Sequence, residues 1–171
     1  GMYGPKWTST TYTMLTLRQL GLAPNNPQAK RACKLFLDEG FYTDGGINFF
    51  SRAIWKHSET CVTGMILSLL AYFHYTDERI HAIAAHLTGQ QMKDGGWNCE
   101  SRKGATHSSF HTTISALEGL YEYQCTYPEK KKRITQIRAR GHEFLLAHRL
   151  YKSHRTGEVF DAKMTAMPTI A

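Results

Sequence analysis

The stretch Gln91-Met92-Lys93-Asp94-Gly95-Gly96-Trp97 follows a segment of helical character, and part of it occurs twice in the chain. Asp44-Gly45-Gly46 is the earlier copy, and 94 − 44 gives a spacing of 50 residues. A fixed period of this length is typical of supersecondary units that stack, because one unit cannot bury its apolar face alone. The repeat therefore predicts an array of similar helical units.

Apolar spacing predicts six helices in this array. Between Asn26 and Gly40, apolar residues recur at i, i+3, i+4, i+7 and i+8, which places them along one side of a helix. Asn26 is a good N-cap, and the proline that follows it suits a first helical turn. A capping box at Thr126–Glu129 predicts the start of the last helix. We expect the helices near residues 9–20, 26–40, 58–73, 76–87, 108–120 and 126–145.

These helices differ in polarity. The segment 58–73 is apolar nearly all round, whereas 26–40 and 76–87 have a narrow apolar stripe and a charged back. A helix without a polar face is buried on both sides. We therefore predict an all-α fold of three helical hairpins in two concentric layers. It is one domain over residues 1–171, with repeats at about 7–56, 57–106 and 107–158 and a tail at 159–171.

The inner helices of this arrangement begin with a threonine at similar intervals. Thr10 and Thr60 lie 60 − 10 = 50 residues apart, and Thr60 and Thr112 lie 112 − 60 = 52 residues apart. This spacing predicts that the three inner helices share one register and start at the same end of the array.

Composition narrows the classes of protein to consider. The chain is 42% hydrophobic, and no run reaches the ~18–20 apolar residues of a membrane span. A formal net charge of +7 comes largely from the basic block Lys130–Arg133 and its neighbours, which we interpret as a solvated helix face. No nucleic-acid-binding motif accompanies it. Four cysteines without a CxxC pair indicate reduced thiols. We expect a cytoplasmic protein without a transmembrane segment or a nucleic-acid partner.

The repeated stretch resembles a known motif. Leu87, Gln91 and Gly95-Gly96-Trp97 match the QW motif of the terpenoid cyclases, in which an aliphatic residue precedes Gln by four positions and G-x-W follows. Over about residues 7–158 the chain is similar to the terpenoid cyclase and protein prenyltransferase superfamily, whose members share the α/α toroid. The resemblance therefore implies an all-α, α/α toroid-like fold in which the three helical hairpins form a partial barrel. The structural motif here comprises Gln91, Asp94, Gly95, Gly96 and Trp97. Its Gln can satisfy backbone groups at a helix end, and its Trp can cover the turn.

The acidic motifs of that superfamily are missing. The chain has five aspartates, and no two lie within three residues of each other, so neither D-x-D-D nor D-D-x-x-D occurs. The catalytic residues are unknown, and whether the chain is an enzyme stays open. One hypothesis is a terpenoid cyclase-like or prenyltransferase-like domain that binds an isoprenoid or another apolar small molecule. The alternative is a non-catalytic helical-repeat module for protein interaction.

Polar residues gather where the inner helices begin. Free N–H groups and helix dipoles there favour an anion such as phosphate or carboxylate, although capping by Ser and Thr also explains the hydroxyl residues. The candidate pocket residues are His57, Glu59, Cys61, His107, His111, Trp7 and Tyr12. The expected apolar lining consists of Met65, Leu69, Phe73, Trp7, Tyr12 and Phe110.

A zinc site is a further hypothesis for this end of the array. His107 and His111 are four residues apart, so they share one face of a helix that includes both. Cys99 precedes His107 by eight residues, and the three side chains are a plausible Cys-His-His ligand set. Zinc is therefore the one cofactor that the sequence suggests.

Three hairpins form an open arc rather than a closed barrel. The concave side of the apolar helix 58–73 would then have few partners, and large exposed apolar patches are uncommon in soluble monomers. We predict that a second copy of the chain covers this wall in a homodimer. The tail from Tyr151 onward is the other segment that could cover it.

Overall fold

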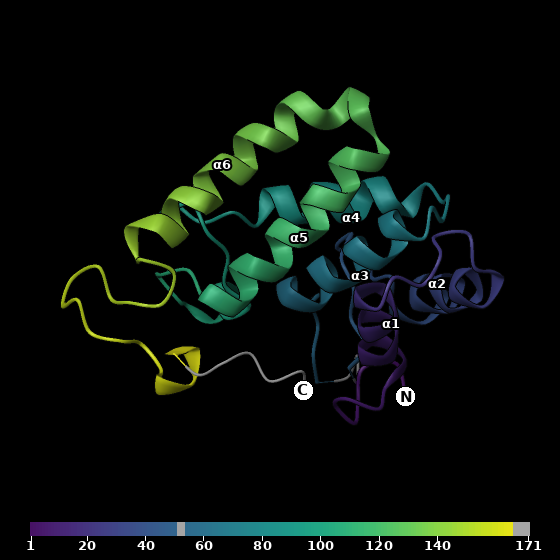
Figure 1. Cartoon of the computed structure of the whole chain (residues 1–171), viewed down its shortest axis with the longest axis horizontal. Coiled ribbons are helices and arrows are strands. Elements are labelled where there is room, and N and C mark those ends of the chain that lie inside the picture. Colours follow the sequence, from purple (N-terminus) through teal and green to yellow (C-terminus); the bar gives the residue numbers. More distant parts are fainter. Residues whose placement is uncertain (51–53, 166–171) are drawn as a thin grey trace.

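A computed structural model describes residues 1–50 and 54–165 of the chain. Six α-helices account for most of the described residues (Figure 1): α1 Thr10–Gln19, α2 Pro27–Gly40, α3 Thr60–Tyr72, α4 Arg79–Gly89, α5 Phe110–Thr126 and α6 Lys131–Ala147. Three 3-10 helices are shorter: Ser101–Lys103, Pro128–Lys130 and Ala162–Thr165. Isolated bridges, not strands, are the β-structure within the described ranges. The predicted all-α class is confirmed, and no helix there has the length and apolarity needed to cross a bilayer.

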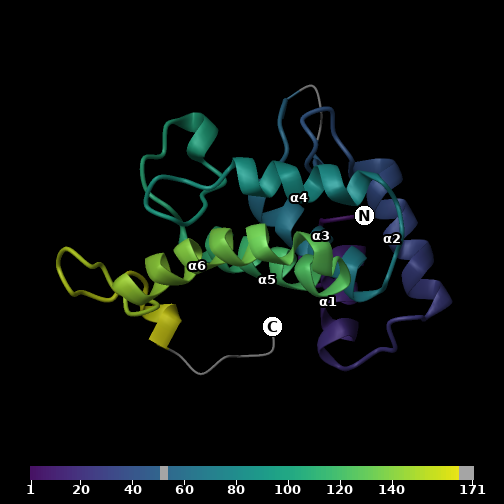
Figure 2. The ribbon, with the colours of Figure 1, turned by 90° about the horizontal axis from the view of Figure 1, so that it is seen from above.

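Helix α3 lies at the centre of the molecule. It packs along α5 and also contacts α1, α2 and α4 (Figures 1 and 2). The backbones of α3 and α5 approach closely because each has a glycine at the contact. A Cβ atom on Gly64 would lie 2.4 Å from the Ser115 carbonyl oxygen, and one on Gly119 would lie 2.5 Å from the Gly64 oxygen. Any side chain at these positions would push the two helices apart.

The expectation that one side of the 58–73 helix lacks partners is wrong. Ile66, Leu69 and Leu70 are completely buried within the single chain. Helices α1 and α5 both lie on α3, and Arg18 of α1 pairs with Glu122 of α5 at 2.7 Å. Burial of α3 by its own chain removes the reason for covering it with a second copy, so a homodimer stays a prediction without this support.

The odd-numbered helices α1, α3 and α5 begin at Thr10, Thr60 and Phe110, at equal intervals of 50 residues. The register that placed Thr112 opposite Thr60 is therefore wrong by two residues. The capping box expected at Thr126 is also wrong. Thr126 ends α5, where its hydroxyl donates to the Glu122 carbonyl at 3.0 Å, and α6 begins only after a 3-10 turn.

Each Asp-Gly-Gly copy forms the same turn and fixes the start of the next odd-numbered helix. In the first copy, the Ser58 N–H and hydroxyl donate to the Asp44 carboxylate. The Ile47 N–H donates to the Thr63 hydroxyl at 3.0 Å, which ties the turn to the first coil of α3. The corresponding pairs in the second copy are Ser108–Asp94 and Trp97–Thr113. The 50-residue period therefore repeats a set of hydrogen bonds as well as a sequence motif.

Trp97 and Gln91 join this turn to two further helices. The Trp97 indole N–H donates to the Leu87 carbonyl in the last turn of α4 at 2.7 Å, and the ring is 0% exposed. The Gln91 amide donates to the Gly95 carbonyl at 2.7 Å and to the Ile137 carbonyl of α6 at 2.8 Å. These bonds satisfy a carbonyl at the end of α4 and hold the turn against α6.

Replacing Trp97 by Ala is expected to lower the free energy of unfolding by roughly 3–5 kcal/mol, because a buried aromatic ring and its hydrogen bond are both lost. Chemical denaturation followed by circular dichroism measures the change. Trp7→Ala is the matched control, because Trp7 is 58% exposed and should cost little. Equal stabilities of the Trp97 variant and the parent protein would contradict the structural role.

Candidate functional site

The first group of predicted pocket residues lies at the start of α3. His57 and Glu59 precede the helix, and Cys61 is its second residue. His57 and Glu59 line a small cavity of about 20 Å³ together with Cys99, Arg102 and Lys103. Burial raises the pKa of the Glu59 carboxyl, although Lys103 opposes this shift. Three of the predicted residues, His57, Glu59 and Cys99, are therefore brought together.

Cys61 and Cys99 are in direct contact beside this cavity. The Cys61 N–H donates to the Cys99 sulfur at 3.2 Å, and the Thr112 hydroxyl donates to the same sulfur at 3.4 Å. The hydrogen bond from the Cys61 thiol, together with these donors, lowers the pKa of Cys99 to about 7. The same contact, together with burial, raises the pKa of Cys61. A backbone N–H group at the start of α3 thus already binds a sulfur atom of the same chain, that of Cys99.

The zinc set Cys99, His107 and His111 does not assemble. Within residues 1–50 and 54–165, no three His, Cys, Asp or Glu side chains gather where they could hold a metal ion. His107 precedes α5, which begins at Phe110, so the two histidines do not share the helical face that their spacing suggested. Both are exposed, whereas the Cys99 sulfur bonds at the start of α3.

The predicted apolar pocket also separates into unrelated places. Leu69 and Phe73 are completely buried in the core and cannot line a cavity. Trp7 is exposed and packs on Tyr12 with 5.0 Å between ring centroids. Phe110 packs instead on Phe144 and the tail residue Phe160. Met65 is half-buried on α3. The expected apolar lining is therefore wrong.

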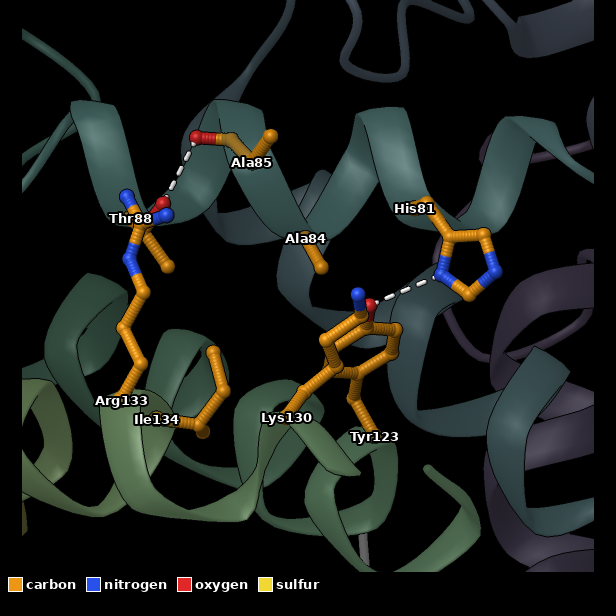
Figure 3. Close-up of a pocket in the computed structure, with 8 residues that line it drawn as sticks. All are labelled: His81, Ala84, Ala85, Thr88, Tyr123, Lys130, Arg133 and Ile134. Carbon is orange, nitrogen blue, oxygen red and sulfur yellow. Dashed lines mark hydrogen bonds between the residues drawn. The ribbon is translucent and has the colours of Figure 1, made fainter. Parts of the chain in front are cut away.

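A larger cavity lies between α4, α5 and the start of α6, with a volume of about 320 Å³ (Figure 3). Its residues come from three helices and from the turn before α6: His81, Ala84, Ala85, Thr88, Tyr123, Lys130, Arg133 and Ile134. Figure 3 shows Lys130 and Arg133 reaching from the α6 side toward α4, on either side of Ala84. The alanines and Ile134 supply an apolar floor between the two cations.

His81 and Tyr123 form the polar end of this cavity. The His81 Nδ1 atom and the Tyr123 hydroxyl lie 2.8 Å apart. Burial, assisted by the nearby Glu129 carboxylate, raises the pKa of Tyr123 to about 12, so the phenol stays protonated at neutral pH. A protonated phenol can donate to Nδ1, which leaves Nε2 of a neutral imidazole as the N–H donor. The cavity therefore offers donors and positive charge around an apolar floor.

Sequence reasoning missed this cavity. The basic block Lys130–Arg133 was interpreted as a solvated face, and all four of its residues are indeed exposed, but Lys130 and Arg133 also line the cavity. Ile134, which follows the block directly, was the signal that one side of this helix start is covered. The partner surface on α4 lies about fifty residues earlier, and no local pattern connects the two.

Comparison with models of protein families, with curated proteins and with solved structures gives no match for this chain. The resemblance to the terpenoid cyclase superfamily therefore stays a prediction based on the motif residues.

The Asp44 carboxylate lies in a polar cluster beneath the start of α3. Burial by itself raises its pKa, but hydrogen bonds from Ser58 and Gly46 and the nearby His86 outweigh burial and lower the pKa overall. His86 Nδ1 lies 2.8 Å from the Asp44 carbonyl oxygen, and Arg102 lies 3.3 Å from the carboxylate. Asp44 thus joins the first turn to α3, α4 and the loop after Trp97.

Asp44→Asn is expected to lower the free energy of unfolding by about 1–3 kcal/mol at pH 7, because the hydrogen bonds to a charged carboxylate are weakened. A depressed pKa stabilises the fold above the ordinary value of ~3.9 and loses this effect as the pH falls through the lower folded value. The difference between parent and variant should therefore shrink below about pH 4. Urea denaturation between pH 3 and pH 7 measures it.

Asp161→Asn serves as the control, because Asp161 is exposed and outside this cluster. A difference between Asp44→Asn and the parent that stays constant from pH 7 to pH 3 would contradict the assigned pKa direction.

Proposed function

We propose that the chain is a terpenoid cyclase-like helical-repeat domain that binds an amphipathic anion in the cavity between α4, α5 and α6. The ligand class is a phosphate or carboxylate attached to a short isoprenoid or similar apolar chain. One observation supports this most: Lys130 and Arg133 lie beside an apolar floor that ends at the His81–Tyr123 pair.

The repeat architecture supports the first part of the proposal. α1, α3 and α5 start at equal intervals, and the turns before α3 and α5 are held by equivalent Asp–Ser and backbone–Thr hydrogen bonds. Gln91 and Trp97 connect the second turn to α4 and α6. This is the behaviour that the QW-like motif implies, and an α/α toroid-like partial barrel is the arrangement that we propose for it.

The charges around the cavity support the second part. Lys130 and Arg133 lie on opposite sides of Ala84, so an anionic head group would form charge-assisted hydrogen bonds, which are stronger than neutral ones, with one of these cations, while the other adds positive potential. The dipole of α6 adds positive potential, because Lys130 and Arg133 lie at its N-terminal end. Ala84, Ala85 and Ile134 can contact a hydrocarbon chain. The cavity volume is at the lower end of the ~300–1,000 Å³ that is usual for small-molecule sites, so a short chain suits it best.

The proposal is limited to binding. A cyclase that starts by protonating a double bond needs an activated carboxylic acid, and the five aspartates of this chain are isolated in sequence. In the cavity itself, the ionisable groups are a histidine, a tyrosine and two cations. This set holds an anion and has no carboxyl group that could act as the acid.

The test is isothermal titration calorimetry with geranyl phosphate, with neutral geraniol as the comparison ligand. We expect Lys130→Ala and Arg133→Ala each to weaken the binding of geranyl phosphate about 10-fold, which corresponds to ~1.4 kcal/mol. Ala85→Trp should abolish binding of the phosphate because Ala85 lines the cavity, and the residue is exposed enough for the change not to disturb the core.

Lys132→Ala is the matched control, because it removes the same charge from the same block without touching the cavity. Equal weakening by Lys132→Ala would show that net charge alone attracts the ligand, and this would contradict the proposed site. Failure of the parent protein to bind at millimolar geranyl phosphate would also contradict it and would favour the non-catalytic interaction module.

A further inference from the structure

Two of the four cysteines are placed for chemistry that the ligand cavity does not involve. Cys61 is the second residue of α3, and Cys99 lies in the loop that follows the second Asp-Gly-Gly turn. The Cys99 sulfur is 3.2 Å from the Cys61 backbone nitrogen, which is two bonds from the Cβ atom of Cys61. The Cys61 thiol is also hydrogen-bonded to the Cys99 sulfur, so the two thiols lie side by side although 38 residues separate them (99 − 61).

The surroundings of the Cys99 sulfur favour its ionised form. A backbone N–H at the start of a helix and the Thr112 hydroxyl both donate to it, and the α3 dipole directs positive potential at it. Such surroundings are typical of reactive thiolates. Burial and, to a smaller extent, the Glu59 carboxylate act in the opposite direction, yet the pKa of Cys99 remains lowered to about 7.

The other two cysteines lack these features. Cys33 is buried in the core of α2, and burial raises its pKa to about 12. Cys125 is exposed near the end of α5, where a helix dipole is negative. Cys99 is thus distinguished from Cys33 by access and from Cys125 by its hydrogen-bond donors.

A small cavity is lined in part by Cys99. Its volume of about 20 Å³ can hold one molecule close to the size of water. Lys103, Arg102 and His57 lie around it and can donate hydrogen bonds to a small oxygen-containing molecule. A bulky disulfide such as oxidised glutathione does not fit this space, whereas a peroxide does.

We propose that Cys99 is a peroxide-reactive thiolate and that Cys61 is its resolving partner, so that the two form an intramolecular disulfide. In the first step the Cys99 thiolate attacks one oxygen of hydrogen peroxide, the O–O bond breaks, and hydroxide leaves; Cys99 becomes a sulfenic acid. In the second step the Cys61 sulfur attacks the Cys99 sulfur, the S–O bond breaks, and water forms with the proton from Cys61. The two cysteines lose two electrons, and peroxide is reduced to one water and one hydroxide; the hydroxide becomes a second water when it takes up the proton that Cys99 released on ionisation.

The disulfide would link the loop after Trp97 to the start of α3. Cross-links that close a loop of this length restrict the unfolded chain, so the melting temperature of the oxidised protein should rise by roughly 5–15 °C. The thiol pair would in this way couple peroxide to the rigidity of the end of the molecule where α3 and α5 begin.

Intact-mass spectrometry and peptide mapping of the purified full chain test the proposal, after treatment with a small excess of hydrogen peroxide and alkylation of the remaining thiols. We expect a loss of 2 Da and a Cys61–Cys99 cross-linked peptide in the parent and in Cys125→Ser. Cys61→Ser should instead accumulate sulfenic acid at Cys99, seen as the gain of one oxygen atom (about 16 Da) on the peptide that contains Cys99. Thr112→Val should slow the oxidation of Cys99 by peroxide at pH 7 several-fold, because one hydrogen-bond donor is lost.

Two results would overturn the proposal. One is oxidation of Cys125 before Cys99 in the folded parent protein. The other is a Cys61–Cys99 pair that stays reduced in excess peroxide while Cys61→Ser gains no oxygen at Cys99. Circular dichroism of each variant confirms that the protein is folded during the assay.

Discussion

The close contact between the α3 and α5 backbones is the constraint on which the rest of the structure depends. Gly64 and Gly119 have no side chain to separate the two helices, and the atoms that a Cβ would meet are backbone atoms that cannot rotate away. With α5 fixed against it, α3 has partners on several sides, because α1, α2 and α4 also contact it. A helix as apolar as α3 is stable in water only when it is surrounded in this way.

This contact also fixes the geometry of both proposed sites. At one end it holds the starts of α3 and α5 together, so that Thr112 of α5 and Cys61 of α3 both reach the Cys99 sulfur. Toward the other end, Tyr123 of α5 meets His81 of α4, which itself packs on α3. The thiol pair and the ligand cavity lie in different places but share one rigid support.

The sequence predicts the helices well because their signals are local. Asn26 caps α2 through its side chain, and Gly21 follows α1 with a positive φ of 80°, as a C-terminal glycine should. The sequence-based predictions fail where a local match of residue type disagrees with the 50-residue period. Thr112 resembles Thr60 by type, but the 50-residue repeat places Phe110 opposite Thr60 and Thr113 opposite Thr63. The i, i+4 spacing of His107 and His111 would place both side chains on one face only if a helix included both residues. Helix α5 begins at Phe110, after His107.

The two copies of the turn show which positions carry the fold and which are free to carry chemistry. The aspartate, the glycines, the serine 14 residues later and the threonine form the same hydrogen bonds in both copies. The positions between them diverge: Cys99 stands where the first copy has Phe49, and Cys61 corresponds to His111 in the second copy. The thiol contact therefore joins the turn of one copy to the helix of the other, at two positions that the period does not constrain. Repetition makes the scaffold predictable, whereas a site between copies depends on how the copies differ and on how α3 and α5 pack.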